Sequence, residues 1–130
     1  MCMEFVGKLK ERSIDGIPGL YVIITQDADS NQVLMQAYAN KEAVLKTVET
    51  GLAHYYSTSR HKIWLKGESS GNTQKIIEIL VDCDADALIY KVEQKTGACH
   101  KGFESCFYRT IKGGDFVENA KPVFDPKKVY

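Results

Sequence analysis

Short runs of β-branched and aromatic residues, separated by brief polar stretches, recur along most of this chain. Such runs are typical of β-strands. The expected strands cover residues 20–25, 33–39, 53–58, 63–66, 75–81 and 87–94, with a last one near 105–109. The first two are predicted to form a hairpin. Because strands outnumber helices and many connections are short, the sequence predicts an α+β fold dominated by antiparallel sheet.

One main helix is predicted, over residues 41–50. Asn40 is a favourable N-cap and Gly51 a favourable stop. Between them, one face of the predicted helix carries Ala43, Val44, Thr47 and Val48.

A chain of 130 residues suits one domain with its own core. Since no internal repeat or linker is visible, we expect a single domain over residues 1–112 and a C-terminal tail over 113–130. The tail contains a Gly-Gly pair and two prolines, Pro122 and Pro126, and shows no clear period. We expect it to wrap the surface or fray.

The charges balance, with 17 Lys and Arg against 17 Asp and Glu. A neutral chain has no global field that attracts nucleic acid or anionic lipid, so we expect neither partner. The apolar runs are far too short to span a bilayer, and the N-terminus does not resemble a signal peptide. We therefore expect a cytoplasmic protein, in which the four cysteines are thiols or metal ligands rather than disulfides.

The densest chemical signal is an acidic run in which Asp82, Asp84 and Asp86 alternate with Cys83 and Ala85. In an extended chain the three aspartates share one face and Cys83 points to the other. Carboxylates roughly 7 Å apart repel one another unless they are protonated, solvated or bridged by a cation. Oxygen ligands suit Mg²⁺, Mn²⁺ or Ca²⁺. A solvated acidic turn explains the same spacing equally well.

A second signal combines Cys99, His100 and Cys106. Together with Cys83, these cysteines give three thiols that can converge on a soft metal, for which zinc is the default. The spacing differs from that of zinc fingers, which show paired C-x₂-C knuckles. The alternative is that Cys83 and Cys106 are small buried hydrophobic residues. Cys2, near the N-terminus, is left out of this site.

Positive charge gathers beside a loop rich in Gly, Ser and Thr, between residues 60 and 73. Such a loop can cradle phosphate through backbone N–H groups and hydroxyls. The candidate substrate- and phosphate-binding residues are Arg60, Lys66, Glu68, Ser69, Ser70, Gly71 and Asn72. The loop lacks the Walker and dinucleotide fingerprints, so an ordinary polar hairpin loop is the alternative.

Three segments together resemble the phosphoribosyl-AMP cyclohydrolase family: residues 68–74 (ESSGNTQ), 82–88 (DCDADAL) and 98–109 (ACHKGFESCFYR). Residues 33–38 and 57–60 also resemble its N-terminal motifs. The resemblance covers roughly residues 16–109 and rests on motifs that occur in the family's order and separation. Two departures are Asn72, where many members have His, and Tyr56, where many have Trp.

The resemblance implies one zinc ion per subunit, bound by Cys83, Cys99 and Cys106. It also implies one magnesium ion per subunit, bound by Asp82, Asp84 and Asp86. It further implies an intertwined homodimer whose zinc site takes cysteines from both chains. The implied reaction is hydrolysis of the N1–C6 bond of 1-(5-phosphoribosyl)-AMP, the third step of L-histidine biosynthesis. Because the chain ends soon after Arg109, we expect no fused pyrophosphatase.

Within this family, three thiolates would leave a zinc site with net negative charge and weaken its pull on the proton of bound water. Another group must then assist deprotonation, and His100, next to a thiol, is the candidate general base. The alternatives for His100 are a hydrogen-bond partner of a zinc ligand or a fourth ligand. The two phosphates of the substrate would be neutralised by magnesium and by the segment over residues 60–73.

Two other classes of function compete with this one. A zinc nucleobase deaminase would need an H-x-E…P-C-x-x-C signature, which the sequence lacks. A zinc-stapled binding module would explain the cysteines but not the three alternating aspartates. A structural zinc has four protein ligands, so a free coordination position distinguishes the enzyme from the module.

Overall fold

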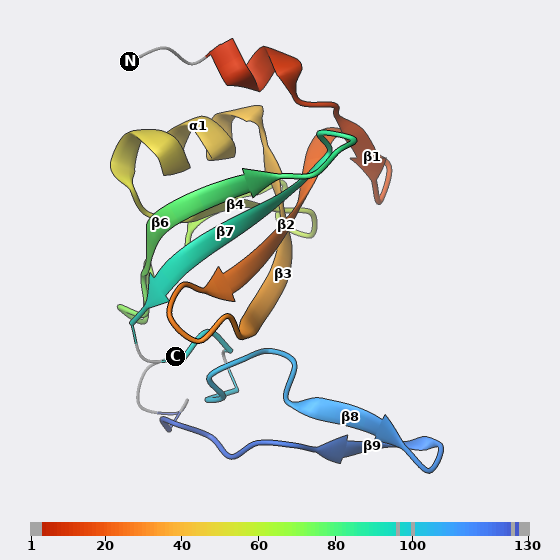
Figure 1. Ribbon diagram of the computed structural model, residues 1–130, viewed down its shortest axis with the longest axis vertical. Helices are drawn as coiled ribbons and strands as arrows, with labels where there is room; N and C mark the ends of the chain where they lie inside the picture. The colour runs from red at the N-terminus through yellow and green to blue at the C-terminus, as the bar shows by residue number, and fades with distance from the viewer. Residues whose placement is uncertain (1–3, 96, 100, 126, 128–130) are drawn as a thin grey trace.

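The computed structural model describes residues 4–95, 97–99, 101–125 and 127. A seven-stranded sheet forms the body of the molecule, with strand order β5-β4-β3-β2-β7-β6 and with β1 paired to β2 (Figure 1). Its strands are β1 (Arg12–Ile14), β2 (Ile17–Asp27), β3 (Val33–Asn40), β4 (His54–Ser57), β5 (Lys62–Leu65), β6 (Gln74–Val81) and β7 (Ala87–Gln94). The 3₁₀ helix η1 (Glu4–Lys8) precedes them, and α1 (Lys41–Thr50) follows β3. The predicted α+β class is confirmed.

The sheet is mixed rather than purely antiparallel. Among the described strands the sequential pairings are antiparallel, but β2 and β7 run parallel, from Val22 opposite Ala87 to Asp27 opposite Val92. Parallel neighbours need a long crossover connection, and here the whole segment from β3 to β6 supplies it. The parallel pair joins the β2–β3 hairpin to the β6–β7 hairpin. It therefore fixes the positions of the turn between β6 and β7 and of the loop that follows β7.

The helix α1 has the predicted bounds and the predicted caps. The Asn40 side chain accepts a hydrogen bond from the Ala43 N–H at 2.8 Å, and Gly51 ends the helix with a φ of 77°. The side chains of Ala43, Val44 and Thr47 are buried. None of the helices in the described segments is long and apolar enough to cross a membrane.

A buried polar network ties the start of β6 to the end of β7. The Tyr55 hydroxyl, fully buried in the core, bonds Thr25 Oγ1 at 2.7 Å and donates to Gln74 Oε1. The Gln74 amide donates in turn to Gln94 Oε1 at 2.7 Å. From the other side, the Gln94 amide donates to the Asn72 carbonyl at 3.1 Å. Because buried polar groups need their partners, the network fixes the loop before β6 against the end of β7.

A second, two-stranded sheet differs from the sequence prediction. Its strands β8 (Arg109–Lys112) and β9 (Asp115–Glu118) form a hairpin that projects from the main sheet (Figure 1). A strand was expected near residues 105–109, but Ser105 lies in a loop because its hydroxyl donates to the Val33 carbonyl at 2.7 Å. Residues 115–118, expected in an irregular tail, are a strand because the Gly-Gly pair forms the turn of the hairpin.

Candidate functional site

The three aspartates of the acidic run lie in the turn between β6 and β7. Asp82, Asp84 and Asp86 each place one carboxylate oxygen within 4.8 Å of the others, and no other such group occurs among the described residues. An extended chain, with the three aspartates on one face, was predicted here and is not what the structure has. Instead the chain turns, with a hydrogen bond from Ala85 N–H to the Asp82 carbonyl and a φ of 59° at Ala85. The turn, and not strand alternation, therefore brings the carboxylates together.

The three carboxylates are not equivalent. Asp82 Oδ1 accepts the N–H groups of Asp86 and Ala87, at 3.1 and 3.2 Å, and so holds the turn closed. Asp86 is buried and bound by the Arg12 guanidinium at 2.5 Å, which is the main reason that the pKa of its carboxyl is lowered. Asp84 is exposed. A site built only from oxygens at this spacing fits a hard divalent cation, and Arg12 already meets part of its need for positive charge.

Two of the three candidate thiols lie together in the loop between β7 and β8. Hydrogen bonds from Cys99 N–H to the Phe103 carbonyl and from Cys106 N–H to the Leu34 carbonyl fix the two ends of this loop, at 3.1 and 2.6 Å. Cys99 is buried. Cys106 is exposed when the whole residue is considered, but its thiol is largely enclosed by neighbouring atoms. Burial of the thiol, followed by its neighbour Cys99, raises the pKa of Cys106 to about 11. A bound metal cation would reverse this preference and stabilise the thiolates.

The third thiol, Cys83, lies at the other end of β7. Figure 1 shows the acidic turn beside β1 at one end of this strand and the loop toward β8 at its opposite end. β7 has eight residues, so it spans roughly 25 Å at about 3.3 Å per residue. It pairs with β2 and β6 along its length and does not fold back. One chain therefore does not bring Cys83 to Cys99 and Cys106. His100 lies outside the described residues.

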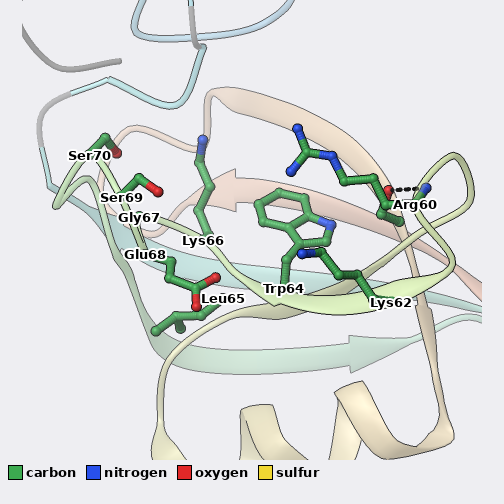
Figure 2. A pocket seen from close by; sticks show the side chains of 10 residues that line it. Arg60, Lys62, Trp64, Leu65, Lys66, Gly67, Glu68, Ser69 and Ser70 are labelled. Carbon is green, nitrogen blue, oxygen red and sulfur yellow. Dashed lines mark hydrogen bonds between the residues drawn. The ribbon is translucent and has the colours of Figure 1, made fainter.

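A cavity of about 400 Å³ lies over β5 and the loop that follows it (Figure 2). Of the residues predicted to bind substrate and phosphate, Arg60, Lys66, Glu68, Ser69 and Ser70 line it. Gly71 and Asn72 are not among the lining residues. Five residues outside that predicted set also line the cavity: Ser57, Lys62, Trp64, Leu65 and Gly67. The alternation of side chains along β5 could have indicated Lys62 and Trp64, since both share a face with Lys66.

The loop on one side of the cavity depends on a glycine. Gly67 has a φ of +85°, and a Cβ there would lie 2.5 Å from the backbone of Asn72 and Thr73. Gly71 has a similar φ of +82°, but a Cβ there meets nothing within 4 Å. The loop is also closed by a hydrogen bond from Gly71 N–H to the Gly67 carbonyl at 2.8 Å. Of these two loop glycines, only Gly67 lies so close to other backbone atoms that a side chain has no room.

We expect Gly67→Ala to lower the free energy of unfolding by about 2–5 kcal/mol, combining left-handed strain with overpacking. Gly71→Ala is the matched control, because it carries the same strain without the clash and should cost about 1–2 kcal/mol. Denaturant unfolding of both variants measures the difference. Equal losses in the two would show that the loop can move away from residue 67 at no cost.

Comparison with known proteins places these features in a family. The family model for phosphoribosyl-AMP cyclohydrolase matches residues 35–108, which include the acidic turn, both loop thiols and the lining of the cavity. The phosphoribosyl-AMP cyclohydrolase of Methanothermobacter thermautotrophicus is 55% identical over 113 residues, covering 85% of this chain and 82% of its own. That of Methanoregula boonei is 58% identical over 112 residues, covering 86% and 89%. The histidine biosynthesis bifunctional protein HisIE of Thermoanaerobacter pseudethanolicus is 53% identical over 94% of this chain, which matches 56% of that protein.

Proposed function

This chain belongs to the phosphoribosyl-AMP cyclohydrolase family, and we propose that it opens the N1–C6 bond of 1-(5-phosphoribosyl)-AMP with a zinc-activated water. The family membership makes it a hydrolase of histidine biosynthesis that acts on a cyclic amidine. The observation that carries the zinc proposal is the placement of the thiols. Cys99 and Cys106 meet in one loop, and Cys83 is exposed at the far end of β7.

Two copies of the chain are needed to complete such a zinc site. Sulfur ligands lie about 2.3 Å from zinc, so the three thiols must come within a few ångströms of one another. The length of β7 prevents this within one chain. We therefore propose a homodimer in which Cys99 and Cys106 of one chain share a zinc ion with Cys83 of the other. With three protein ligands, such a site would leave one coordination position open for water.

Exposed apolar side chains support this assembly. On β6, which leads into the turn with Cys83, the exposed apolar residues are Ile77, Leu80 and Val81. On the segment that follows Cys106, they are Phe107, Ile111, Phe116 and Val117. Ile111 is 78% exposed and Phe116 63%. If the zinc joins Cys83 of one chain to Cys106 of the other, these two surfaces lie at the same interface, where each can cover the other.

In the proposed mechanism the residues of this chain bind the substrate and manage the proton. Bound zinc would supply a water of lowered pKa. Phosphoribosylation at N1 makes C6 of the adenine ring electrophilic. The oxygen of a water would add to C6, and the N1–C6 bond would break as N1 takes up a proton and C6 becomes the carbon of the carboxamide. His100, next to Cys99 in the sequence, would take the proton from the water as general base, because three thiolates weaken the pull of the metal on that proton.

The cavity is the proposed site for a phosphoribosyl group. Arg60 and Lys62 supply positive charge there, and the hydroxyls of Ser69 and Ser70 supply donors (Figure 2). Glu68 repels phosphate, so its carboxylate suits the hydroxyls of the ribose. Asp82, Asp84 and Asp86 are the proposed magnesium ligands, and a magnesium ion there would help to neutralise the phosphates.

The direct test is an assay of the full-length protein, loaded with zinc and supplemented with magnesium. Conversion of phosphoribosyl-AMP to the ring-opened carboxamide changes the ultraviolet absorption, which can be followed continuously. We expect turnover that needs both metals. Zinc-loaded protein that binds phosphoribosyl-AMP without converting it would contradict the proposal and favour a binding module.

We expect Asp84→Asn to lose stimulation by magnesium and to keep its zinc, because hard carboxylates and soft thiolates select different ions. Asp84 is the informative position, since Asp82 and Asp86 also hold the turn through Ala87 and Arg12. Metal analysis and a magnesium titration of activity measure the two effects. Asp29→Asn is the control and should behave as wild type, because Asp29 is exposed in the turn between β2 and β3, outside the aspartate cluster. A single ion that accounted for all activity would exclude separate sites.

A further inference from the structure

Lys66 is a buried lysine on the floor of the cavity, with 7% of its surface exposed. Lysines are rarely buried unless their charge is paired. Figure 2 shows its amine directed away from the carboxylate of Glu68. Among the residues that the structure describes, no carboxylate forms an ion pair with it. The described residues that line the cavity therefore do not neutralise the charge of Lys66.

The amine of Lys66 reaches the loop that carries the two thiols. Nζ donates to the Ala98 carbonyl at 2.6 Å, and Ala98 directly precedes Cys99. One neutral carbonyl satisfies one of three N–H donors and does not compensate a buried charge. Lys66 also lies close enough to Cys106 for its positive charge to act on that thiol. The cation thus lies beside the place where negative charge would form.

We propose that Lys66 is a positioning residue of the zinc site, which holds the segment before Cys99 and supplies the counter-charge of the zinc–thiolate centre. This inference rests on the proposed zinc site. Zinc with three thiolates has a net charge of −1, and a buried ammonium next to it neutralises that charge. Lys66 was predicted from its charge to bind phosphate. The structure leaves Arg60 and Lys62 for that role, because their side chains are exposed on the cavity.

The experiment compares the zinc affinity of Lys66→Met, Lys66→Gln and Lys66→Arg with wild type, by competition with a chromophoric chelator. We expect Lys66→Met and Lys66→Gln to bind zinc roughly 10- to 100-fold more weakly, as is usual when a residue supporting a metal ligand is lost. Lys66→Arg keeps the charge and should retain most of the affinity. Lys62→Met is the matched control from the same cavity: it should raise KM and leave the zinc affinity unchanged.

Lys66→Gln separates the charge from the hydrogen bond, because it keeps an N–H donor for the Ala98 carbonyl. If Lys66→Gln binds zinc as tightly as wild type, the proposal is overturned. It is also overturned if Lys66→Met keeps wild-type zinc affinity and has an increased KM, because Lys66 would then bind the substrate phosphate instead. Cobalt substitution gives a second readout, since sulfur-to-cobalt absorption bands should weaken at equal metal concentration. A wild-type protein that binds no zinc would instead overturn the zinc centre itself.

Discussion

Replacing Cys99 with serine is expected to remove the bound zinc and abolish turnover, and the same loss is expected for Cys83→Ser and Cys106→Ser. Each cysteine would supply one of three protein ligands, and a hydroxyl is a much poorer ligand for zinc than a thiolate. Metal analysis should find about one zinc per protomer in wild type and little in the variants. Cys2→Ser is the control and should be silent. Wild-type zinc content in all three variants would contradict the site.

The same variants test whether the site is shared. Co-refolding Cys83→Ser with Cys99→Ser in the presence of zinc should restore activity, because one of the two sites in each heterodimer is then intact. At most about half of the sites in each heterodimer would work. Co-refolding Cys99→Ser with Cys106→Ser is the matched control and should restore nothing, since these residues lie in one loop of one chain and each site keeps a lesion. An inactive first heterodimer, where refolded wild type recovers, would place each site within one chain.

His100→Asn is expected to keep its zinc and to lose turnover by roughly 10²-fold or more, the usual size of a general acid–base contribution. The rate of the variant should rise toward high pH, because hydroxide replaces the missing base. Stopped assays over a pH series, with metal analysis of the same samples, measure both effects. His61→Asn is the control: His61 is exposed with a φ of 55°, a conformation that Asn tolerates.

A wild-type rate and pH profile in His100→Asn would remove the histidine from the proposed mechanism. Loss of zinc from the same variant would make it a ligand instead.

The elements set by local signals could be predicted from the sequence. The helix over residues 41–50 has an N-cap at Asn40 and a stop at Gly51, and the structure begins and ends it there. The parallel pairing of β2 with β7 could not be predicted, because it joins segments separated by most of the sheet and depends on the global packing. Gly113 and Gly114 carry the local signal of a hairpin turn, although the prediction placed an irregular tail there.

In the candidate site, too, some features could be predicted from local sequence and others depend on the tertiary fold. Three aspartates at alternating positions were identified as a cluster, and the turn at Ala85 brings them together. The spacing of Cys83 and Cys99 left open whether they meet within one chain, and only the extended, fully paired β7 decides against it. Lys66 was grouped with Arg60 by charge and nearness in sequence. Its contact with Ala98, 32 positions away, comes from the tertiary fold.

The length of β7 also affects how catalytic activity depends on the concentration of the chain. If the strand keeps the two halves of the metal site apart in every chain, a chain by itself holds no complete site, and catalysis begins with the encounter of two copies. Below the dissociation constant of the pair, the amount of working enzyme would rise with the square of the chain concentration. A cell that makes few copies would then have disproportionately little activity, and modest changes in synthesis would produce larger changes in flux.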